Sequence, residues 1–283
     1  MAVTSAATAI PISPQTCDYS ADLTGLELWP ASRLLAGYLA SYPRRLADAL
    51  GVGVAAIEIG SGCGLPGLVA ARVLAPDCIA GPVWLTDHGP HVLEPLQCSV
   101  SANKLDAVCR VAELDWGHLS QLEGQTGSSS FGLVLCSEVL FSSSAAPLLA
   151  HVLSQLLSES GVALVAHTLR FTVCMSRDAT GGVVPLFSTT DEPLSAFQSL
   201  CTANGLIQRS LTECSHEGVT VQLLALSRDA QTTRLRQHAF AVQFGLLKHA
   251  RTDMLSLTAQ PRQLQHQTGV KPEHRVMSLQ SPA

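Results

Sequence analysis

Residues 55–67 read AAIEIGSGCGLPG, a short apolar run followed by an acidic residue and three glycines at alternate positions. The run predicts a buried strand, and Pro66 predicts a helix that extends to about Leu74, because proline is favoured in the first turn of a helix. Glycine is needed where the backbone takes a positive φ or passes close to a ligand. A strand, a glycine turn and a helix start in this order predict a nucleotide-type binding site at the carboxyl edge of a parallel sheet.

The glycine spacing bears on the class of ligand. Gly60, Gly62 and Gly64 form G-x-G-x-G, whereas dinucleotide-binding folds use G-x-G-x-x-G, for which Gly67 would have to supply the last glycine. Taken alone, the loop is also compatible with an ordinary glycine-rich turn. The remaining motifs have to decide between these interpretations.

Composition indicates a globular enzyme-like chain. Its 283 residues are 47% apolar and 14% charged, which suits one sizeable α/β domain. No apolar run is long enough to span a membrane, and the first twenty residues lack the basic region of a secretory signal. The nine cysteines form no C-x-x-C pair, which favours reduced thiols over a disulfide framework or a metal site. We therefore expect a cytoplasmic protein, with the nucleus as the other compartment left open.

Charge is unevenly distributed. Residues 227–283 contain eight of the 17 Lys/Arg and three of the 22 Asp/Glu, so this tail carries +5 and residues 1–226 carry −10. An acidic body disfavours nucleic acid as a ligand and favours a basic peptide or protein. The basic tail, in turn, is suited to an acidic partner.

Proline and tryptophan mark the start of an early helix. Residues 1–20 are rich in small polar residues and predict a flexible lead-in. Pro30 predicts a helix that Pro43 stops, with Trp29 directly before it. Trp29 is interpreted either as an aromatic at the edge of the core or as part of the site.

A carboxylate ends the second predicted strand. Residues 82–87 form a buried run whose single acidic residue, Asp87, falls 23 positions after Gly64. In nucleotide-binding folds a carboxylate near this position accepts the ribose hydroxyls. Asp87 is also placed to cap a helix over residues 92–104. Both roles remain open at this point.

The rest of the chain to residue 226 alternates between strand and helix patterns. Strands are predicted over 107–112, 131–136 and 161–167, a helix over 147–157, and a loop over the polar run 124–130. Residues 206–213 and 219–226 predict an antiparallel pair at the edge of the sheet. Such alternation predicts a doubly wound, mostly parallel sheet.

The end of the fourth predicted strand combines a carboxylate with an aromatic ring. Glu138 and Phe141 lie three residues apart, so in a turn or a first helical loop they face the same way. An aromatic face and a carboxylate suit a cationic or amine ligand. The alternative is that Glu138 caps the next helix and Phe141 belongs to the core.

Five motifs occur in a recognisable order: Leu28-Trp29-Pro30-Ala31, Glu58 to Gly67, Leu85-Thr86-Asp87, Leu114-Asp115-Trp116-Gly117 and Ser137-Glu138-Val139-Leu140-Phe141. Together they make residues 24–226 resemble the S-adenosylmethionine-dependent lysine methyltransferases called methyltransferase-like 21 or methyltransferase family 16. The resemblance implies a Rossmann-like, doubly wound, seven-stranded, mostly parallel sheet with an antiparallel final strand, over residues 21–228. It also implies S-adenosyl-L-methionine as cofactor, no metal, and a protein as substrate.

The resemblance also assigns residues. Its cofactor-binding set is Trp29, Glu58, Gly60, Ser61, Gly62, Gly64, Asp87, Trp116 and Ser137. Within this set, residues 60–62 would lie under the methionine moiety, Asp87 would hold the ribose, and Trp116 would lie by the adenine. Glu138 and Phe141 match the signature that borders the target side chain, and they are the candidate catalytic residues.

The chain departs from the family pattern in two places. Glu138 and Phe141 replace the Asp and Tyr of the family signature, so the phenolic hydroxyl is missing. Residues 171–190 match no family feature. A methyltransferase of a protein histidine or a small molecule therefore stays open as an alternative. The basic tail leaves open a third one, a cofactor-binding protein without activity that acts through partners. Beyond residue 228 the sequence predicts a basic amphipathic helix over 231–250 and a disordered end over 251–283.

Overall fold

The computed structural model describes residues 24–170, 173–177, 180, 182–187, 190–216 and 218–229. The lead-in over 1–20, the predicted helix over 231–250 and the end over 251–283 lie outside these residues. The expected domain boundaries and the acidic partner of the basic tail therefore stay predictions.

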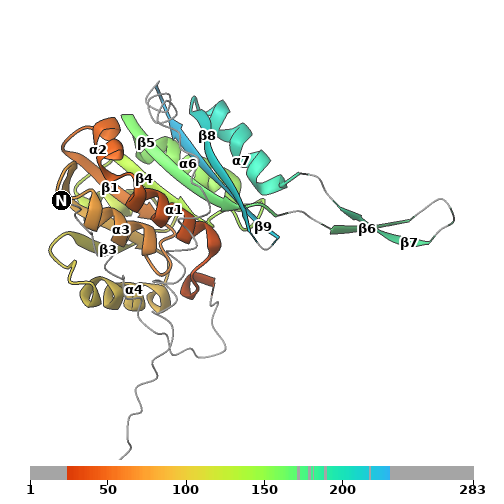
Figure 1. Ribbon diagram of the computed structural model, residues 1–283, viewed down its shortest axis with the longest axis horizontal. Helices are drawn as coiled ribbons and strands as arrows, with labels where there is room; N and C mark the ends of the chain where they lie inside the picture. The colour runs from red at the N-terminus through yellow and green to blue at the C-terminus, as the bar shows by residue number, and fades with distance from the viewer. Residues whose placement is uncertain are drawn as a thin grey trace, which may run out of the picture.

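Seven strands form one sheet (Figure 1), in the order β3 (Cys109–Glu113), β2 (Ile79–Asp87), β1 (Val54–Ile59), β4 (Phe131–Ser137), β5 (Leu157–Thr168), β9 (Val219–Ser227) and β8 (Ile207–His216). Strands β1 to β5 pair in parallel, whereas β9 is antiparallel to both of its neighbours. The predicted seven-stranded sheet with an antiparallel final strand is confirmed, and so is the predicted pairing of 206–213 with 219–226.

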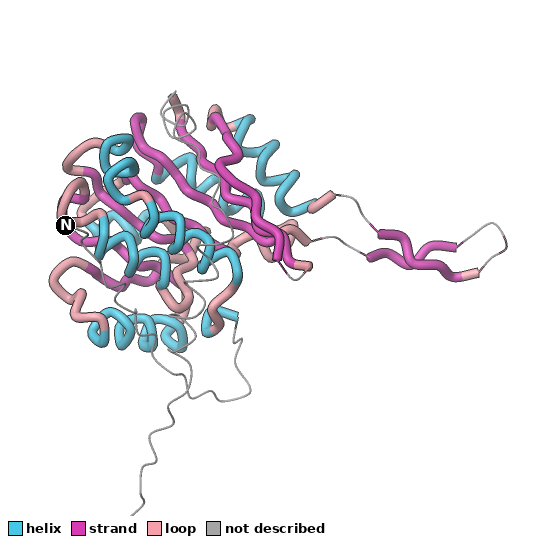
Figure 2. The backbone as a smooth tube through the Cα atoms, viewed as in Figure 1, coloured by secondary structure: helices cyan, strands magenta, loops and turns pink. Residues whose placement is uncertain are grey.

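Helices cover both faces of the sheet (Figure 2). One face packs against α1 (Pro30–Ser41), α2 (Pro43–Leu50), α3 (Leu65–Val73) and α4 (Pro90–Ala102), and the other against α5 (Ser120–Thr126), α6 (Ala145–Leu156) and α7 (Glu192–Ala203). Alternate residues of β1 point to opposite faces of the sheet. Ala56 packs in the core on the side of α1 to α4, and Ile57 packs in the core on the side of α5 to α7. This alternation follows from the two-residue period of a strand.

Proline sets several helix starts. Five helices, α1, α2, α3, α4 and α7, carry a proline at their first or second position, as predicted for Pro30 and Pro66. The sequence did not predict α2, because Pro43 was interpreted only as a stop.

The predicted loop over 124–130 is wrong in its first part, since α5 runs to Thr126 and ends at Gly127 in the left-handed conformation. Leu122 anchors this short helix to the core, which outweighs the weak helix propensity of Gly124.

A hairpin projects from the domain between β5 and α7. Its strands β6 (Val173–Arg177) and β7 (Val183–Phe187) pair antiparallel with each other and form a separate two-stranded sheet. In Figure 1 the hairpin extends away from the seven-stranded sheet at the right of the view. It accounts for most of the segment that matched no family feature.

Two further expectations concern cysteines and membranes. The seven cysteines whose side chains the structure describes are free thiols, and six of them are buried. Within the described ranges, no helix has both the length and the apolar character that crossing a membrane requires.

Candidate functional site

The carboxyl ends of β1, β2 and β4 open into one cavity of about 710 Å³. This volume is in the range of small-molecule and cofactor sites. Ten of the eleven residues predicted for the site line the cavity: Trp29, Gly60, Ser61, Gly62, Gly64, Asp87, Trp116, Ser137, Glu138 and Phe141. The topology thus brings together residues that are more than 100 positions apart in the chain.

Glu58 is the exception, and the expectation that it contacts a ligand is corrected. Its side chain is fully buried beneath the glycine turn, where Oε2 accepts a hydrogen bond from the Gly67 N–H at 3.0 Å. The other oxygen, Oε1, has no hydrogen-bond partner among the described residues. Burial raises the pKa of Glu58 from 4.5 to about 8. Glu58 therefore supports the turn from below and does not line the cavity.

The glycine turn is tightly packed against the start of the described chain. Gly62 has a φ of +51°, and a Cβ there would lie 2.8 Å from the carbonyl oxygen of Gly25. Gly64 is left-handed and forms the N-cap of α3. An L side chain at either position would be strained. Gly60, Gly62 and Gly64 line the cavity and present no side chain to it.

Asp87 faces this turn. Its Oδ2 accepts from the Gly62 N–H at 2.7 Å, and its Oδ1 accepts from the His88 N–H at 2.7 Å. Burial raises the pKa of Asp87, and these two hydrogen bonds lower it. The alternative role as a helix cap is contradicted, because the N-cap residue of α4 is Gly89 and no side chain forms a capping hydrogen bond at the start of this helix. A carboxylate has about four acceptor sites, so two remain for a ligand.

Two tryptophans form walls of the cavity. Trp29 is half-buried before α1, and its Nε1–H donates to the Thr24 carbonyl at 2.9 Å, so it is held at the cavity and is not part of the buried core. Trp116 follows β3 in a turn closed by the Gly117 N–H, which donates to Asp115 at 2.8 Å. The Trp116 ring lies 3.8 Å from the position that a Cβ of Gly60 would take. A flat apolar surface thus lies beside the glycine turn.

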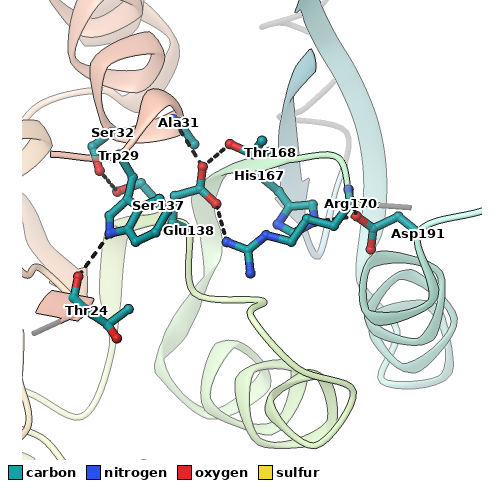
Figure 3. Close-up of polar contacts among 10 residues, drawn as sticks. All are labelled: Thr24, Trp29, Ala31, Ser32, Ser137, Glu138, His167, Thr168, Arg170 and Asp191. Carbon is teal, nitrogen blue, oxygen red and sulfur yellow. Dashed lines mark hydrogen bonds and ion pairs between the residues drawn. The ribbon is translucent and has the colours of Figure 1, made fainter. Parts of the chain in front are cut away.

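The end of β4 has an unusual backbone. Glu138 has a φ of +57°, which is uncommon for a residue other than glycine. Its carboxylate does not cap the following helix α6. Instead, Oε1 accepts from the Ala31 N–H at 3.3 Å and from the Thr168 hydroxyl, and Oε2 accepts from Arg170 Nη2 at 3.1 Å (Figure 3). Phe141 is 62% exposed, which also contradicts its alternative place in the core.

Besides the Ala31 N–H, three side chains that contact Glu138 or Ser137 were missed by sequence reasoning. Thr168 is the last residue of β5, Arg170 follows two residues later, and Ser32 Oγ lies 2.8 Å from Ser137 Oγ. No local signal connects Arg170 to a carboxylate 32 positions earlier. The available clue was topological, because β5 pairs in parallel with β4 and its carboxyl end must lie beside that of β4.

The chain is similar to proteins of known activity. A family model described as lysine methyltransferase matches residues 15–178. The histone-arginine methyltransferase METTL23 of Mus musculus is 36% identical over 99 residues, 34% of this chain and 34% of that protein. The calmodulin-lysine N-methyltransferase of Arabidopsis thaliana is 30% identical over 129 residues, 44% of this chain and 38% of that protein. The chain thus matches little more than a third of the length of either relative.

Solved structures resemble the chain at lower identity. The magnesium protoporphyrin IX methyltransferase of Synechocystis PCC 6803, crystallised with bound SAH, is 12% identical with a TM-score of 0.46. The alignment covers 70% of this chain and 82% of that one.

Proposed function

The chain belongs to the lysine methyltransferase family, and from this premise we propose that it is an S-adenosylmethionine-dependent methyltransferase acting on a lysine amine of a protein. One observation carries the proposal. The cavity that holds the glycine turn and Asp87 also has Glu138 and the exposed Phe141 along its wall. A cofactor surface and a surface suited to an amine therefore border the same space.

S-adenosylmethionine is the cofactor, and the residues of the cavity fit its parts. Asp87 has acceptor sites left for ribose hydroxyls, Trp116 offers a flat wall for adenine, and the glycine turn presents backbone to the amino acid moiety. When bound, the cofactor supplies a methyl group on a positively charged sulfur, which is activated for transfer.

The protein's own task is to present an uncharged nucleophile. A lysine amine has a pKa of about 10.4 in water, so the site has to favour its neutral form. Oε2 of Glu138 has a single partner among the described residues and keeps an acceptor site for an amine N–H. Phe141 and Trp29 line the space with apolar surface, which helps to exclude water and to orient the amine. The proton that the acceptor loses passes to water.

Arginine is the second candidate acceptor. The mouse relative is named a histone-arginine methyltransferase, and in this chain a guanidinium, that of Arg170, already pairs with Glu138. The carboxylate is therefore able to hold a guanidinium group. Arg170 already pairs with this carboxylate, however, which supports lysine as the first candidate.

The experiment that tests the proposal has two steps. Calorimetric titration with S-adenosylmethionine should show saturable binding at one site. Incubation with radiolabelled cofactor and a fractionated cell lysate, followed by acid hydrolysis, should then place the label in methyl-lysine. Label in methyl-arginine would favour the second candidate, and label in methyl-histidine or small molecules would contradict both. Binding without any transfer would contradict the enzymatic proposal.

Glu138→Gln provides the matched variant. The amide keeps the shape and one acceptor oxygen but removes the charge. We expect the rate of methyl transfer to fall at least tenfold while cofactor affinity stays within about twofold. Glu138 and Phe141 form the acceptor side of the cavity, the part of its wall that would contact the substrate amine. Unchanged turnover would remove Glu138 from the mechanism.

A further inference from the structure

The carboxylate of Glu138 is held by donors from two distant segments. The Ala31 N–H comes from the first turn of α1, and the Thr168 hydroxyl and the Arg170 guanidinium come from the segment that ends β5. The Glu138 side chain is only 5% exposed. Its left-handed backbone aims the carboxylate at these partners, and such strain persists only where the surroundings enforce it.

The backbone of Arg170 is itself fixed. Its N–H donates to Asp191 Oδ2 at 2.6 Å, and the same oxygen lies 2.8 Å from His167 Nε2. Asp191 Oδ1 accepts from the Leu194 N–H and so caps α7. His167 and Asp191 are both buried. The start of the Arg170 side chain is thus anchored, while the side chain as a whole remains 37% exposed.

The ion pair changes what the acceptor side can bind. A partly desolvated carboxylate without a cation is a strong site for a guanidinium or an ammonium group. Paired with Arg170, Glu138 presents no net charge to the cavity. Figure 3 shows Arg170 on the side of the Glu138 carboxylate away from Trp29. Arg170 is not among the residues that line the cofactor cavity.

We propose that Arg170 is a specificity-determining residue that neutralises Glu138 and so selects an acceptor that enters as the neutral amine. The proposal rests on the proposed lysine acceptor. The positive charge of Arg170 near the acceptor lowers the pKa of an entering amine. Its guanidinium also takes one acceptor site of Glu138 Oε2, which a cationic arginine side chain would need for a two-point contact. Removing it should convert the acceptor side into a cation site.

Cation binding tests this without any protein substrate. Thermal unfolding of the S-adenosylhomocysteine-loaded protein is followed against methylguanidinium and methylammonium, with NaCl at equal ionic strength as the reference. Arg170→Ala should be stabilised saturably by low millimolar methylguanidinium, with an apparent affinity at least tenfold above that of the wild type. Arg170→Gln is the second variant, should Arg170→Ala unfold. Arg209→Ala, which removes an exposed arginine of β8, is the control and should behave as the wild type.

Two comparisons are decisive. The double variant Glu138→Gln/Arg170→Ala should lose the added cation binding, and Arg170→Lys should restore wild-type behaviour. Equal cation responses in the wild type, Arg170→Ala and Arg170→Gln would overturn the proposal, as would an undiminished response in the double variant.

The transfer reaction supplies a further readout. A bare Glu138 stabilises a protonated lysine, so the pH profile of kcat/KM for methyl-lysine formation should move to higher pH in Arg170→Ala. An unmoved profile would contradict the proposal. If the wild type forms no methyl-lysine, the proposed function fails, and the cation measurements still decide the role of Arg170.

Discussion

At the scale of single residues, Asp87 gives the sharpest test of the cofactor site. Asp87→Ala removes the acceptors that face the cavity and also the partner of the Gly62 N–H. Hydrogen bonds to a charged group contribute about 1.5–3 kcal/mol, so S-adenosylhomocysteine affinity should fall roughly 10- to 100-fold. Calorimetric titration measures this. Asp77→Ala, at an exposed position outside the cavity, is the control and should leave affinity unchanged.

Glu58 predicts a pH dependence of stability. Burial raises its pKa from 4.5 to about 8, so the folded protein binds one more proton than the unfolded chain between these values. The contribution of this extra proton to the free energy of unfolding is fully present below pH 4.5 and is lost as pH rises through about 8. Each pKa unit corresponds to about 1.4 kcal/mol, so the loss amounts to a few kcal/mol.

Glu58→Gln should remove this component, because the amide does not titrate. Urea unfolding of both proteins at pH 5.5 and 8.5 measures the difference. We expect the free energy of unfolding of the variant to increase relative to that of the wild type as pH rises. A stability difference that is constant across this range would show that Glu58 does not carry the dependence.

At the scale of elements, the glycine turn has to stay free of side chains. Gly62→Ala combines a positive φ with a Cβ 2.8 Å from the Gly25 carbonyl oxygen, and that oxygen belongs to backbone. We expect a loss of about 1–3 kcal/mol in stability together with weaker cofactor binding. Gly124→Ala is the matched control, because its Cβ would meet nothing within 4 Å and it lies inside α5. It should stabilise by up to about 1 kcal/mol. Similar effects of the two substitutions would contradict the account of the turn.

The sequence predicted the elements whose signals are local. Pro30 and Pro66 marked helix starts, and the apolar run before Gly60 marked β1, because propensity and period act over neighbouring residues. The limits of α5 were missed because a buried side chain, Leu122, decides them through tertiary packing. The role of Glu58 was missed for a similar reason, since only the packing of α3 on β1 shows that its carboxylate faces inward.

The partners of Glu138 could not be found from local signals. Arg170 reaches Glu138 only because β5 lies beside β4, and Ala31 does so only because α1 begins over the same sheet edge. The sequence could place Glu138 at the site through its position after a strand. It could not show that the carboxylate is already paired, and this pairing decides what charge the acceptor side presents.

At the scale of the whole molecule, the hairpin of β6 and β7 is separable from the sheet. Its strands pair with each other, and the seven-stranded sheet closes without them. The hydrogen bond from the Arg170 N–H to Asp191 brings the two ends of the insertion together at its base. We therefore expect that residues 171–190 can be replaced by a four-residue Gly/Ser linker.

The expected result is a fold of nearly unchanged stability. An isolated two-stranded hairpin is marginally stable in water, so its loss costs little. Shortening the connection from twenty residues to four lowers the entropy of loop closure by about 1.4 kcal/mol. The melting temperature should stay within about 5 °C of the full chain, and S-adenosylhomocysteine affinity within about twofold.

The closure at the base of the hairpin is tested in the shortened chain itself. Asp191→Ala there removes the cap of α7, the acceptor of the Arg170 N–H and the partner of the buried His167, and it should cost at least about 1 kcal/mol. A shortened chain that melts far below the full protein would show that the hairpin supports the fold. A shortened chain indifferent to Asp191→Ala would show that its ends are held by other contacts.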